Sequence, residues 1–397
     1  MRETRINWSG TVRSPGHLLL STMLLVLILL SCNQDSIFYD ISIEPEPRVA
    51  IIPGSATEMI LLQNQLFVGT RMSNRFYRYS SDAAGVPGWT AITLPEGTLG
   101  DLATDGDYLY ALIFRGGDPL SESVIMRFNL SDWSWDKAIT VADYSIQSLY
   151  GVPGHIFAGG QQKSNHQNFA LLYHNPVSTY VSISMTRISI LKGALMHPDG
   201  TVYLATMGNG IYTFNRGLTN GPISGTAGAT IAGFREIGGV IVAVSSDGGI
   251  YSGSTNGFTK VSTGVNFTGA MSLWYDVRNE SPDPSLLLLG IRGSGVSRTH
   301  GYREMPLQNG VPAADIQIQI PGTEPLTSVV NNAKYTASIG VHPVEVIMQV
   351  PDVSRGGPLD YSRFTGNPEW EPPIFAGTTK DGLWAYRDGE WNTETEE

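Results

Sequence analysis

The chain contains a single thiol, Cys32, at a position that suggests a specific chemistry. Cys32 directly follows Leu29-Leu30-Ser31, at the end of a largely apolar run of 13 residues from Leu18 to Leu30 that has three arginines before it. A helix that spans a bilayer needs about 20 residues, so this run is too short and has instead the length of the apolar part of a signal peptide. A thiol is a nucleophile, so Cys32 is a residue that could accept a covalent modification.

The four residues Leu29 to Cys32 resemble the lipobox of bacterial lipoproteins, which has apolar residues, a small residue and then the acceptor cysteine. The resemblance implies that residues 1–31 are removed and that Cys32 becomes the lipidated first residue. Two or three acyl chains such as palmitate, at about 0.8 kcal/mol per buried CH₂, would anchor the protein to a membrane of the bacterial cell envelope, on its periplasmic side or its surface. The alternative is that Cys32 is a buried or free thiol at the end of an uncleaved anchor.

The remaining residues follow no spacing that marks a catalytic or metal site. The histidines show neither the His-x-x-x-His nor the His-Glu-x-x-His pattern, and no Gly-x-Ser-x-Gly elbow or phosphate-binding loop occurs. Asp105 and Asp107 could ligate Ca²⁺, although two aspartates of a turn are the simpler interpretation. We therefore predict no catalytic residue, no metal and no cofactor.

Arginines and tryptophans offer two further candidates for binding. Sialidase chemistry would require three arginines that hold a carboxylate, but no pattern selects three among Arg235, Arg278, Arg292, Arg298 and Arg303. We expect these arginines on the surface. Trp370 lies among prolines and glutamates in a segment that reads as a loop, so it is the candidate for anchoring a sugar or a peptide; most other tryptophans fall at repeat positions and should pack between structural units.

The composition indicates β structure rich in turns. Of 397 residues 45 are glycine, and aromatic residues make up 10%, whereas charged residues are only 15%. A net charge of −11 argues against nucleic acid as a partner, because phosphates would be repelled. One cysteine excludes an intramolecular disulfide framework.

A short cassette repeats along the chain: an apolar run that ends in Gly or Ala, a turn with glycine, and an aromatic-rich run. Seven equivalent positions are Gly69, Ala111, Gly159, Ala205, Ala243, Gly290 and Gly377, at spacings of 42, 48, 46, 38, 47 and 87 residues. The shorter spacings match one four-stranded blade of a β-propeller, for which about 40–45 residues are typical. We predict an all-β propeller of seven blades, with an insertion at Leu307 to Asn332 in the last interval; eight blades are the alternative.

Turns and apolar runs indicate where the strands lie. Asp105-Gly106 and Asp199-Gly200 suit type I′ hairpin turns, in which both central residues have positive φ. Further apolar runs should be the innermost strands that line the channel: Met59 to Leu62, Leu99 to Ala103, Ile146 to Tyr150, Met271 to Tyr275 and Val344 to Val350. The predicted domains are a signal peptide at 1–31, a lipidated tether at 32–48 whose residues Ile37 to Ile43 add a ring-closing strand, and the propeller at 49–397.

The segment Asp381 to Trp391 resembles the Gly-Leu-Trp-x-Tyr-Asp-Gly-x-x-Trp repeat of two-component-regulator-type propellers, and Thr379 to Trp384 resembles a degenerate Asp-box, the hairpin of sialidase-like propellers. The whole chain is similar to lipoproteins of spirochaetes such as treponemes that carry a propeller domain. This resemblance implies the fold and an envelope location, and it implies no activity because propellers have many functions.

The sequence thus favours a lipid-anchored envelope propeller that serves as a noncatalytic binding scaffold for an envelope protein or a glycan. Its partner surfaces should be the insertions at Ser131 to Asp143 and Leu307 to Asn332. One alternative is a hydrolase or lyase that acts on envelope glycans at the channel mouth. It predicts carboxylates and arginines with shifted pKa values gathered at that mouth. Another is an assembly lipoprotein that contacts other proteins through its rim.

Overall fold

The computed structural model describes residues 51–394 apart from 64, 82–86, 117–121, 141–142, 175–180, 186–189, 215–220, 276–283, 294–299, 313–338, 340–342, 351–373, 381 and 388–389. The described residues belong to one compact unit, Ala50–Glu397. Every regular element among them is a β-strand, and none of the described segments is a helix long and apolar enough to cross a membrane. Cys32, Trp370 and the strand predicted at 37–43 lie outside the described residues.

The described strands form seven antiparallel sheets that follow one another along the chain. The first three are β1 (Ala56–Leu62), β2 (Gln65–Thr70), β3 (Arg75–Ser81) and β4 (Pro87–Thr93); β5 (Thr98–Thr104), β6 (Leu109–Phe114), β7 (Ser123–Asn129) and β8 (Ser134–Thr140); and β9 (Tyr144–Val152), β10 (His155–Gln162), β11 (Asn165–His174) and β12 (Val181–Met185). The fourth has three strands, β13 (Leu191–Met196), β14 (Val202–Thr206) and β15 (Gly210–Phe214).

The last three sheets have four strands each. They are β16 (Ile231–Ile237), β17 (Val240–Ser245), β18 (Gly249–Ser254) and β19 (Gly257–Ser262); β20 (Asn266–Trp274), β21 (Leu286–Arg292), β22 (Gly301–Gln308) and β23 (Val311–Pro312); and β24 (Val344–Gln349), β25 (Ile374–Thr378), β26 (Leu383–Arg387) and β27 (Glu390–Thr393).

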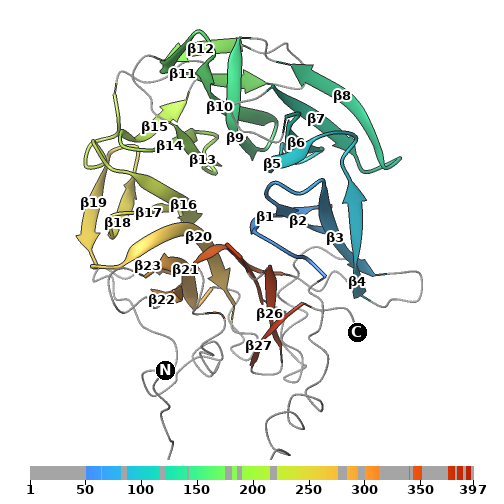
Figure 1. The fold of residues 1–397 in the computed structure, drawn as a ribbon. Helices are drawn as coiled ribbons and strands as arrows, with labels where there is room; N and C mark the ends of the chain where they lie inside the picture. Colours follow the sequence, from blue (N-terminus) through green and yellow to red (C-terminus); the bar gives the residue numbers. More distant parts are fainter. Residues whose placement is uncertain are drawn as a thin grey trace, which may run out of the picture. The chain divides into compact units, whose positions relative to one another are not determined.

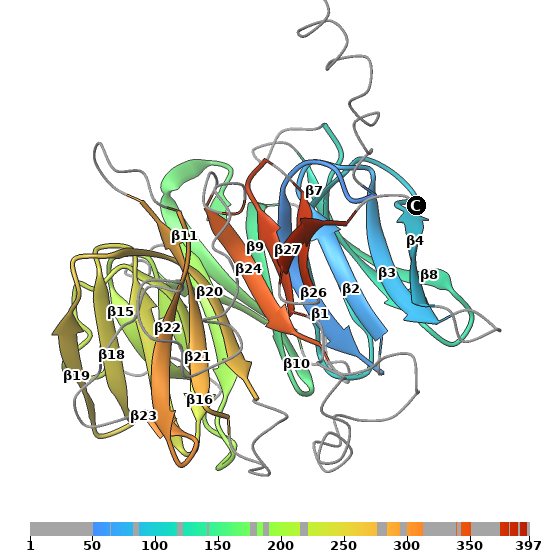
Figure 2. The same cartoon turned by 90° about the horizontal axis from the view of Figure 1, so that it is seen from below.

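These sheets stand side by side around a ring, with the first strand of each sheet innermost (Figures 1 and 2). Each innermost strand contacts the innermost strand of the next sheet, and β24 contacts β1. The apolar core is divided accordingly, because each of its seven clusters lies between two neighbouring sheets. The prediction of an all-β propeller is confirmed, and the five predicted innermost strands lie at or close to their predicted positions. Since β20 and β24 contact each other, no described sheet stands between them.

Residues just before β1 link the two ends of the ring. The amide of Ile51 donates to the carbonyl of Glu394 (3.0 Å), and the amide of Gly382 donates to the carbonyl of Gly54 (2.9 Å). The indole of Trp89 in β4 donates to a carboxylate oxygen of Glu394 (2.8 Å). The first sheet is therefore fixed to the last by hydrogen bonds from both backbone and side chains.

Among the described sheets the fourth departs from the predicted repeat, and one of the two predicted insertions is wrong. In the fourth sheet residues 221–229 cover the edge of β15, where the amide of Ile223 donates to Ile211 and that of Gly210 donates to Ala229 (2.8 and 3.0 Å). In the second sheet the expected insertion at Ser131 to Asp143 is wrong, because residues 134–140 form β8, the regular fourth strand. Most of the other predicted insertion, 307–332, lies outside the described residues; its first part forms the end of β22 and the short β23.

The glycines of the repeat lie where neighbouring sheets come closest. A Cβ on Gly69 would approach Leu99 and Leu102 of β5, at 3.2 and 3.0 Å. At Gly159 it would meet Leu191 of β13 (2.9 Å), and at Gly377 it would overlap the backbone oxygen of Ala56 in β1. The absent side chains let the innermost strand of the next sheet pack directly against β2, β10 and β25.

One buried carboxyl group lies in the packing between the sixth and seventh sheets. Glu304 of β22 is 0% exposed and pairs across the sheet with Leu288, so both side chains point to the cluster shared with the last sheet. Neither of its carboxyl oxygens has a hydrogen-bond partner among the described residues. Burial raises the pKa of Glu304 to about 8, so the group is largely protonated at neutral pH.

We expect Gly377→Ala to destabilise the propeller by about 1–3 kcal/mol, because the added Cβ must displace the backbone of β1 at the junction of the first and last sheets. Gly88→Ala is the matched control, since nothing lies within 4 Å of a Cβ at that position of β4. The measurement is the midpoint of chemical denaturation of both variants. Equal stability of the two variants would show that the close approach does not constrain the ring.

Candidate functional site

Every innermost strand contains a β-bulge close to its first residues. The pairing register with the second strand shifts at this point in all seven sheets. An unpaired bulge residue is turned out of the ladder and can present its side chain in a new direction. The residues passed over in the pairing are Thr57, Gly100, Gln147, Lys192, Ala232, the segment 268–270, and Glu345.

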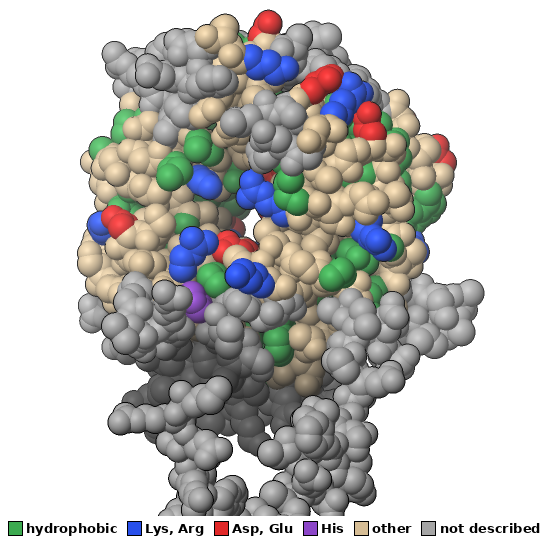
Figure 3. Space-filling view, in the orientation of Figure 1, with side chains coloured by type: hydrophobic (Ala, Val, Ile, Leu, Met, Phe, Trp, Pro, Cys, Tyr) green, Lys and Arg blue, Asp and Glu red, His purple; other side chains and the backbone are tan. Residues whose placement is uncertain are grey.

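All these bulge residues line one cavity in the centre of the ring, which has a volume of about 570 Å³. Figure 3 shows Lys and Arg side chains gathered around the central opening, with acidic side chains beside them. The charged residues of the lining are Glu58, Arg71, Asp101, Lys192, Arg235 and Glu345. A concave site of this size with convergent polar groups has the usual dimensions of a small-ligand pocket.

Glu58 of β1 and Asp101 of β5 form a hydrogen-bonded carboxyl pair between the first two sheets. Asp101 is 7% exposed and accepts hydrogen bonds from the amides of Leu102 and Leu149 (3.0 and 2.8 Å). These two hydrogen bonds stabilise the ionised form of its carboxyl group. Burial, the charge of Asp101 and the hydrogen bond to it raise the pKa of Glu58 well above its usual range. Burial also raises the pKa of Asp101, to about 6. Glu58 is therefore the protonated partner, and it donates to Asp101.

A tight turn holds Arg71 beside this pair. The amide of Met72 donates to Leu99 (2.8 Å) and the amide of Leu99 donates to Ser73 (2.7 Å), which ties the β2–β3 turn to β5. The positive charge of Arg71 favours the ionised forms of Glu58 and Asp101, although burial has the larger effect on both. Tyr150 of β9 lines the same cavity. Its pKa is raised mainly by burial and, to a smaller extent, by the charges of Asp101 and Glu58.

The remaining charges come from the other side of the ring. Glu345, the bulge residue of β24, forms an ion pair with Arg292 at the end of β21 (2.9 Å). Arg235 of β16 donates to the carbonyl of Met271 (3.4 Å). Lys192, the bulge residue of β13, is half-buried, and the described residues offer it no ion pair or hydrogen bond.

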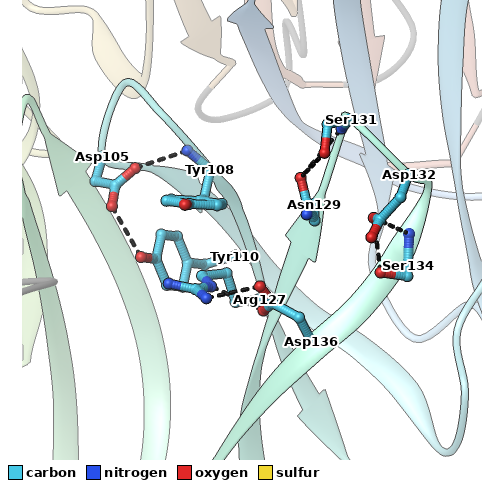
Figure 4. A network of polar contacts seen from close by, with 9 residues as sticks. All are labelled: Asp105, Tyr108, Tyr110, Arg127, Asn129, Ser131, Asp132, Ser134 and Asp136. Carbon is cyan, nitrogen blue, oxygen red and sulfur yellow. Dashed lines mark hydrogen bonds and ion pairs between the residues drawn. The ribbon is translucent and has the colours of Figure 1, made fainter.

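The predicted Ca²⁺ candidate is a structural turn in the second sheet (Figure 4). One oxygen of Asp105 accepts from the amides of Asp107 and Tyr108 (3.0 and 2.8 Å), and the other accepts from the hydroxyl of Tyr110 (2.8 Å). Arg127 pairs with Asp136 through two bonds of 2.8 and 2.6 Å. The oxygens of Asp105 are thus occupied by the protein, and no group of three potential metal ligands occurs among the described residues.

The type I′ prediction for the two Asp-Gly turns is wrong. Gly106 and Gly200 have positive φ, but neither Asp105 nor Asp199 does. The aspartates instead accept backbone hydrogen bonds two residues further on, from Asp107 and Thr201. The turns are held by their side chains, which act as Asx caps.

An exposed tryptophan lies in the β7–β8 turn. Trp133 is 41% exposed, has a φ of 58° that is rare for a bulky residue, and stacks on the guanidinium of Arg78 at 4.1 Å. Two side chains fix the turn: Asn129 accepts from Ser131, and Asp132 accepts from Ser134 (Figure 4). This turn, unlike Trp370, lies within the described residues.

The structure brings together residues that the sequence analysis did not select. Of the five arginines considered there, Arg235 lines the cavity and Arg292 contacts it through Glu345, whereas Arg303 lies on β22 and the other two lie outside the described residues. Glu58, Arg71, Asp101 and Lys192 were missed. Glu58, Asp101 and Lys192 share one signal, because each is a charged residue within or next to an apolar run that precedes a repeat cassette. Arg71 lies in the turn of the first cassette and lacks this signal.

The comparisons with known proteins support the fold. No family model matches the chain, and no curated protein sequence matches it. Among solved structures, the extracellular domain of a hybrid two-component system from B. thetaiotaomicron is similar, with a TM-score of 0.50 and 14% identity over 86% of this chain. This chain spans 39% of the length of that one.

Two further structures are similar over nearly their full lengths. A chain of the Mitotic Checkpoint Complex has a TM-score of 0.53 and 11% identity, over 86% of this chain and 95% of its own. The WD40 β-propeller domain of Doa1 has a TM-score of 0.50 and 11% identity, over 86% and 97%. At these identities the likeness shows a β-propeller and carries no activity to this chain.

We expect Asp101→Asn to lower the pKa of Glu58, because the asparagine carries no charge to oppose ionisation of its neighbour. The pKa should stay above its ordinary value, since burial is the largest cause of the shift. The measurement is a ¹³C NMR titration of the glutamate carboxyl groups, with Glu304 in the sixth sheet as an internal control that does not move. An unchanged midpoint for Glu58 would show that the two carboxyl groups are not coupled.

Proposed function

We propose that this chain is a lipid-anchored propeller of a bacterial cell envelope that binds a small polar ligand in its central channel without reacting with it. One observation carries the proposal. Seven bulged strands turn side chains of both charges and several polar groups into a single cavity of about 570 Å³. Bulges interrupt the ladder at a cost in pairing, and they are typical of strands that re-aim side chains next to functional sites.

The lipid anchor rests on the sequence alone. The sole cysteine follows an apolar run of signal-peptide length and a small residue, which is the arrangement that acylation requires. An anchor at Cys32 would hold the propeller close to a membrane by way of the tether 32–48. The proposed location is therefore the bacterial cell envelope.

A protein partner is compatible with this function. The β-propeller fold is common to protein-interaction domains, and one similar structure is a chain of an assembly, the Mitotic Checkpoint Complex. The exposed Trp133 with its stacked Arg78 is the described feature that best suits such a contact, since Trp and Arg are enriched in the centres of interfaces.

A glycan hydrolase or lyase is the second candidate, and one observation favours it. Carboxyl groups with raised pKa values and arginines do gather in the channel, as the sequence analysis expected for an enzyme. The hydrogen bond between Glu58 and Asp101, however, brings their oxygens closer than the 5 Å or more that separates the two carboxyl groups of most glycosidases. This pair cannot flank a glycosidic bond in that way, so binding without reaction is the better conclusion.

The anchor is tested with Cys32→Ala in cells that are fed an alkyne analogue of palmitate. We expect the full-length protein to incorporate the label and to sediment with membranes, and the variant to lose both properties, because no other thiol is present. Ser36→Ala, in the same tether, is the matched control. Label retained by Cys32→Ala would show that the protein is not acylated at this residue.

The binding function is tested by filling the channel. Gln147→Phe puts an aromatic ring at a bulge position of the lining, whereas Asn256→Phe adds the same ring to an exposed turn between β18 and β19. Small solutes of the envelope are screened against full-length protein in detergent by thermal shift, and bound solutes are recovered and examined for bond cleavage. We expect a solute that stabilises the parent protein and Asn256→Phe but not Gln147→Phe, and that is recovered intact. Recovery of cleaved products would support the enzyme instead.

A further inference from the structure

We propose that the channel selects a small organic monoanion with one carboxylate, and that Lys192 holds this carboxylate. The inference rests on the proposed ligand-binding function and names the class of its ligand. It follows from how charges are distributed around the cavity.

The acidic residues of the cavity come from neighbouring sheets and have cationic partners. Glu345, Glu58 and Asp101 lie on β24, β1 and β5, which follow one another around the ring. Arg292 pairs with Glu345, and Arg71 lies close enough to Glu58 and Asp101 to influence both. The charges on this side are therefore nearly balanced.

The opposite side is cationic. The lining residues from β13, β16 and β20 include Lys192 and Arg235 but no acidic residue. Because this excess of positive charge occurs in a chain with a net charge of −11, it is a local feature and not a reflection of the composition. Anions should be concentrated in this part of the channel, because a concave surface that carries charges of one sign raises the local concentration of the opposite ion.

Lys192 is the group best placed to take the anion. It is the bulge residue of β13, so its position lies in the ring of residues turned toward the cavity. It is half-buried, and within the described residues no carboxylate or carbonyl satisfies it. Arg235, by contrast, already donates to Met271 and lies three residues beyond the bulge residue Ala232, further along the strand.

The rest of the lining limits the charge and nature of the ligand. Asp101 and Glu345 are anionic and would repel a phosphate dianion more strongly than a carboxylate. Thr57 and Gln147, the bulge residues of β1 and β9, offer hydroxyl and amide groups to the uncharged part of a ligand. A hydroxylated carboxylate of the size of a sugar acid meets these conditions.

Binding should weaken as the pH rises. Glu58 faces Asp101 on β5, Arg71 in the β2–β3 turn, Glu345 on β24 and Tyr150 on β9. Ionisation of Glu58 adds a negative charge to the cavity and leaves the cations unchanged. An anionic ligand would then lose affinity, whereas a neutral one would not.

The experiment uses full-length protein in detergent and isothermal titration calorimetry. The probes are the carboxylates acetate, lactate and galacturonate, together with galactose and galactose 6-phosphate as the neutral and dianionic counterparts of galacturonate. Lys192→Met removes the charge and keeps the aliphatic stem, and Lys192→Arg restores a cation. Lys163→Met removes a lysine from the exposed β10–β11 turn outside the cavity and is the matched control.

We expect at least one carboxylate to bind, and galacturonate to bind more tightly than galactose or galactose 6-phosphate. Lys192→Met should weaken carboxylate binding about 10- to 100-fold, as is usual for the loss of a charged hydrogen bond, while Lys163→Met should have no effect and Lys192→Arg should recover most of the affinity. Thermal denaturation of each variant verifies that it is folded.

Three results would overturn the inference. Equal binding of galactose and galacturonate would leave the ligand-binding function intact and remove the selection for an anion. Carboxylate binding that Lys192→Met does not weaken would place the anion elsewhere. Absence of binding by all three carboxylates, while the channel-filling Gln147→Phe still abolishes binding of another solute, would show that the proposed function is right and the ligand class is wrong.

Discussion

The ring depends on the close approach of each sheet's second strand to the innermost strand of the next sheet. At Gly159, Gly290 and Gly377 a side chain would collide with residues of the following sheet. Seven apolar clusters, one for each junction, stabilise this arrangement once the strands are near enough to pack. The width of the channel follows from the same distance, because seven innermost strands in contact enclose a cavity of limited size.

The small residues of the second strands lie opposite the bulges of the innermost strands. Gly69 pairs with Glu58, Gly159 with Ser148 and Gly377 with Val346, and each partner is the residue directly after a bulge. The same short stretch thus lets a neighbouring sheet approach and turns a side chain toward the channel. Polar side chains use this proximity to link adjacent sheets: Ser148 donates to Leu191, and Thr268 donates to Val344. Packing and the candidate site are consequently built from the same positions.

The repeat could be predicted from the sequence because its small residues and turns recur at nearly constant spacing. Three of the seven equivalences are displaced by one residue, because the position after the bulge pairs with Leu112, Val244 and Leu289, and not with Ala111, Ala243 and Gly290. A small residue in the sequence shows only approximately where two sheets approach each other. The exact pairing depends on the position of the bulge, and no particular residue type marks a bulge. The repeat is easiest to recognise at a turn such as the one after Thr378, where the threonine hydroxyl donates to the carbonyl of Gly382. Thr206 donates to the carbonyl of Gly210 in the same way.

The candidate site was beyond the reach of the sequence for a related reason. Glu58, Asp101 and Lys192 are isolated charges in separate strands, and they line one cavity only because the sheets stand in a ring. The spacing of these residues along the chain does not indicate such a cluster, because each residue belongs to a different repeat. The raised pKa of Glu58 likewise arises from burial and from a partner 43 positions away.

The ring of bulges also has a consequence for how such a protein can evolve. A bulge residue takes no part in the regular pairing of its strand, so its side chain can be exchanged without altering the register on either side. The present ring holds a threonine, two small residues, an amide, a lysine and a glutamate at six of its positions. Selectivity could therefore change by single substitutions at these positions while the scaffold is inherited intact, which would allow close relatives to share the fold and differ in what they bind.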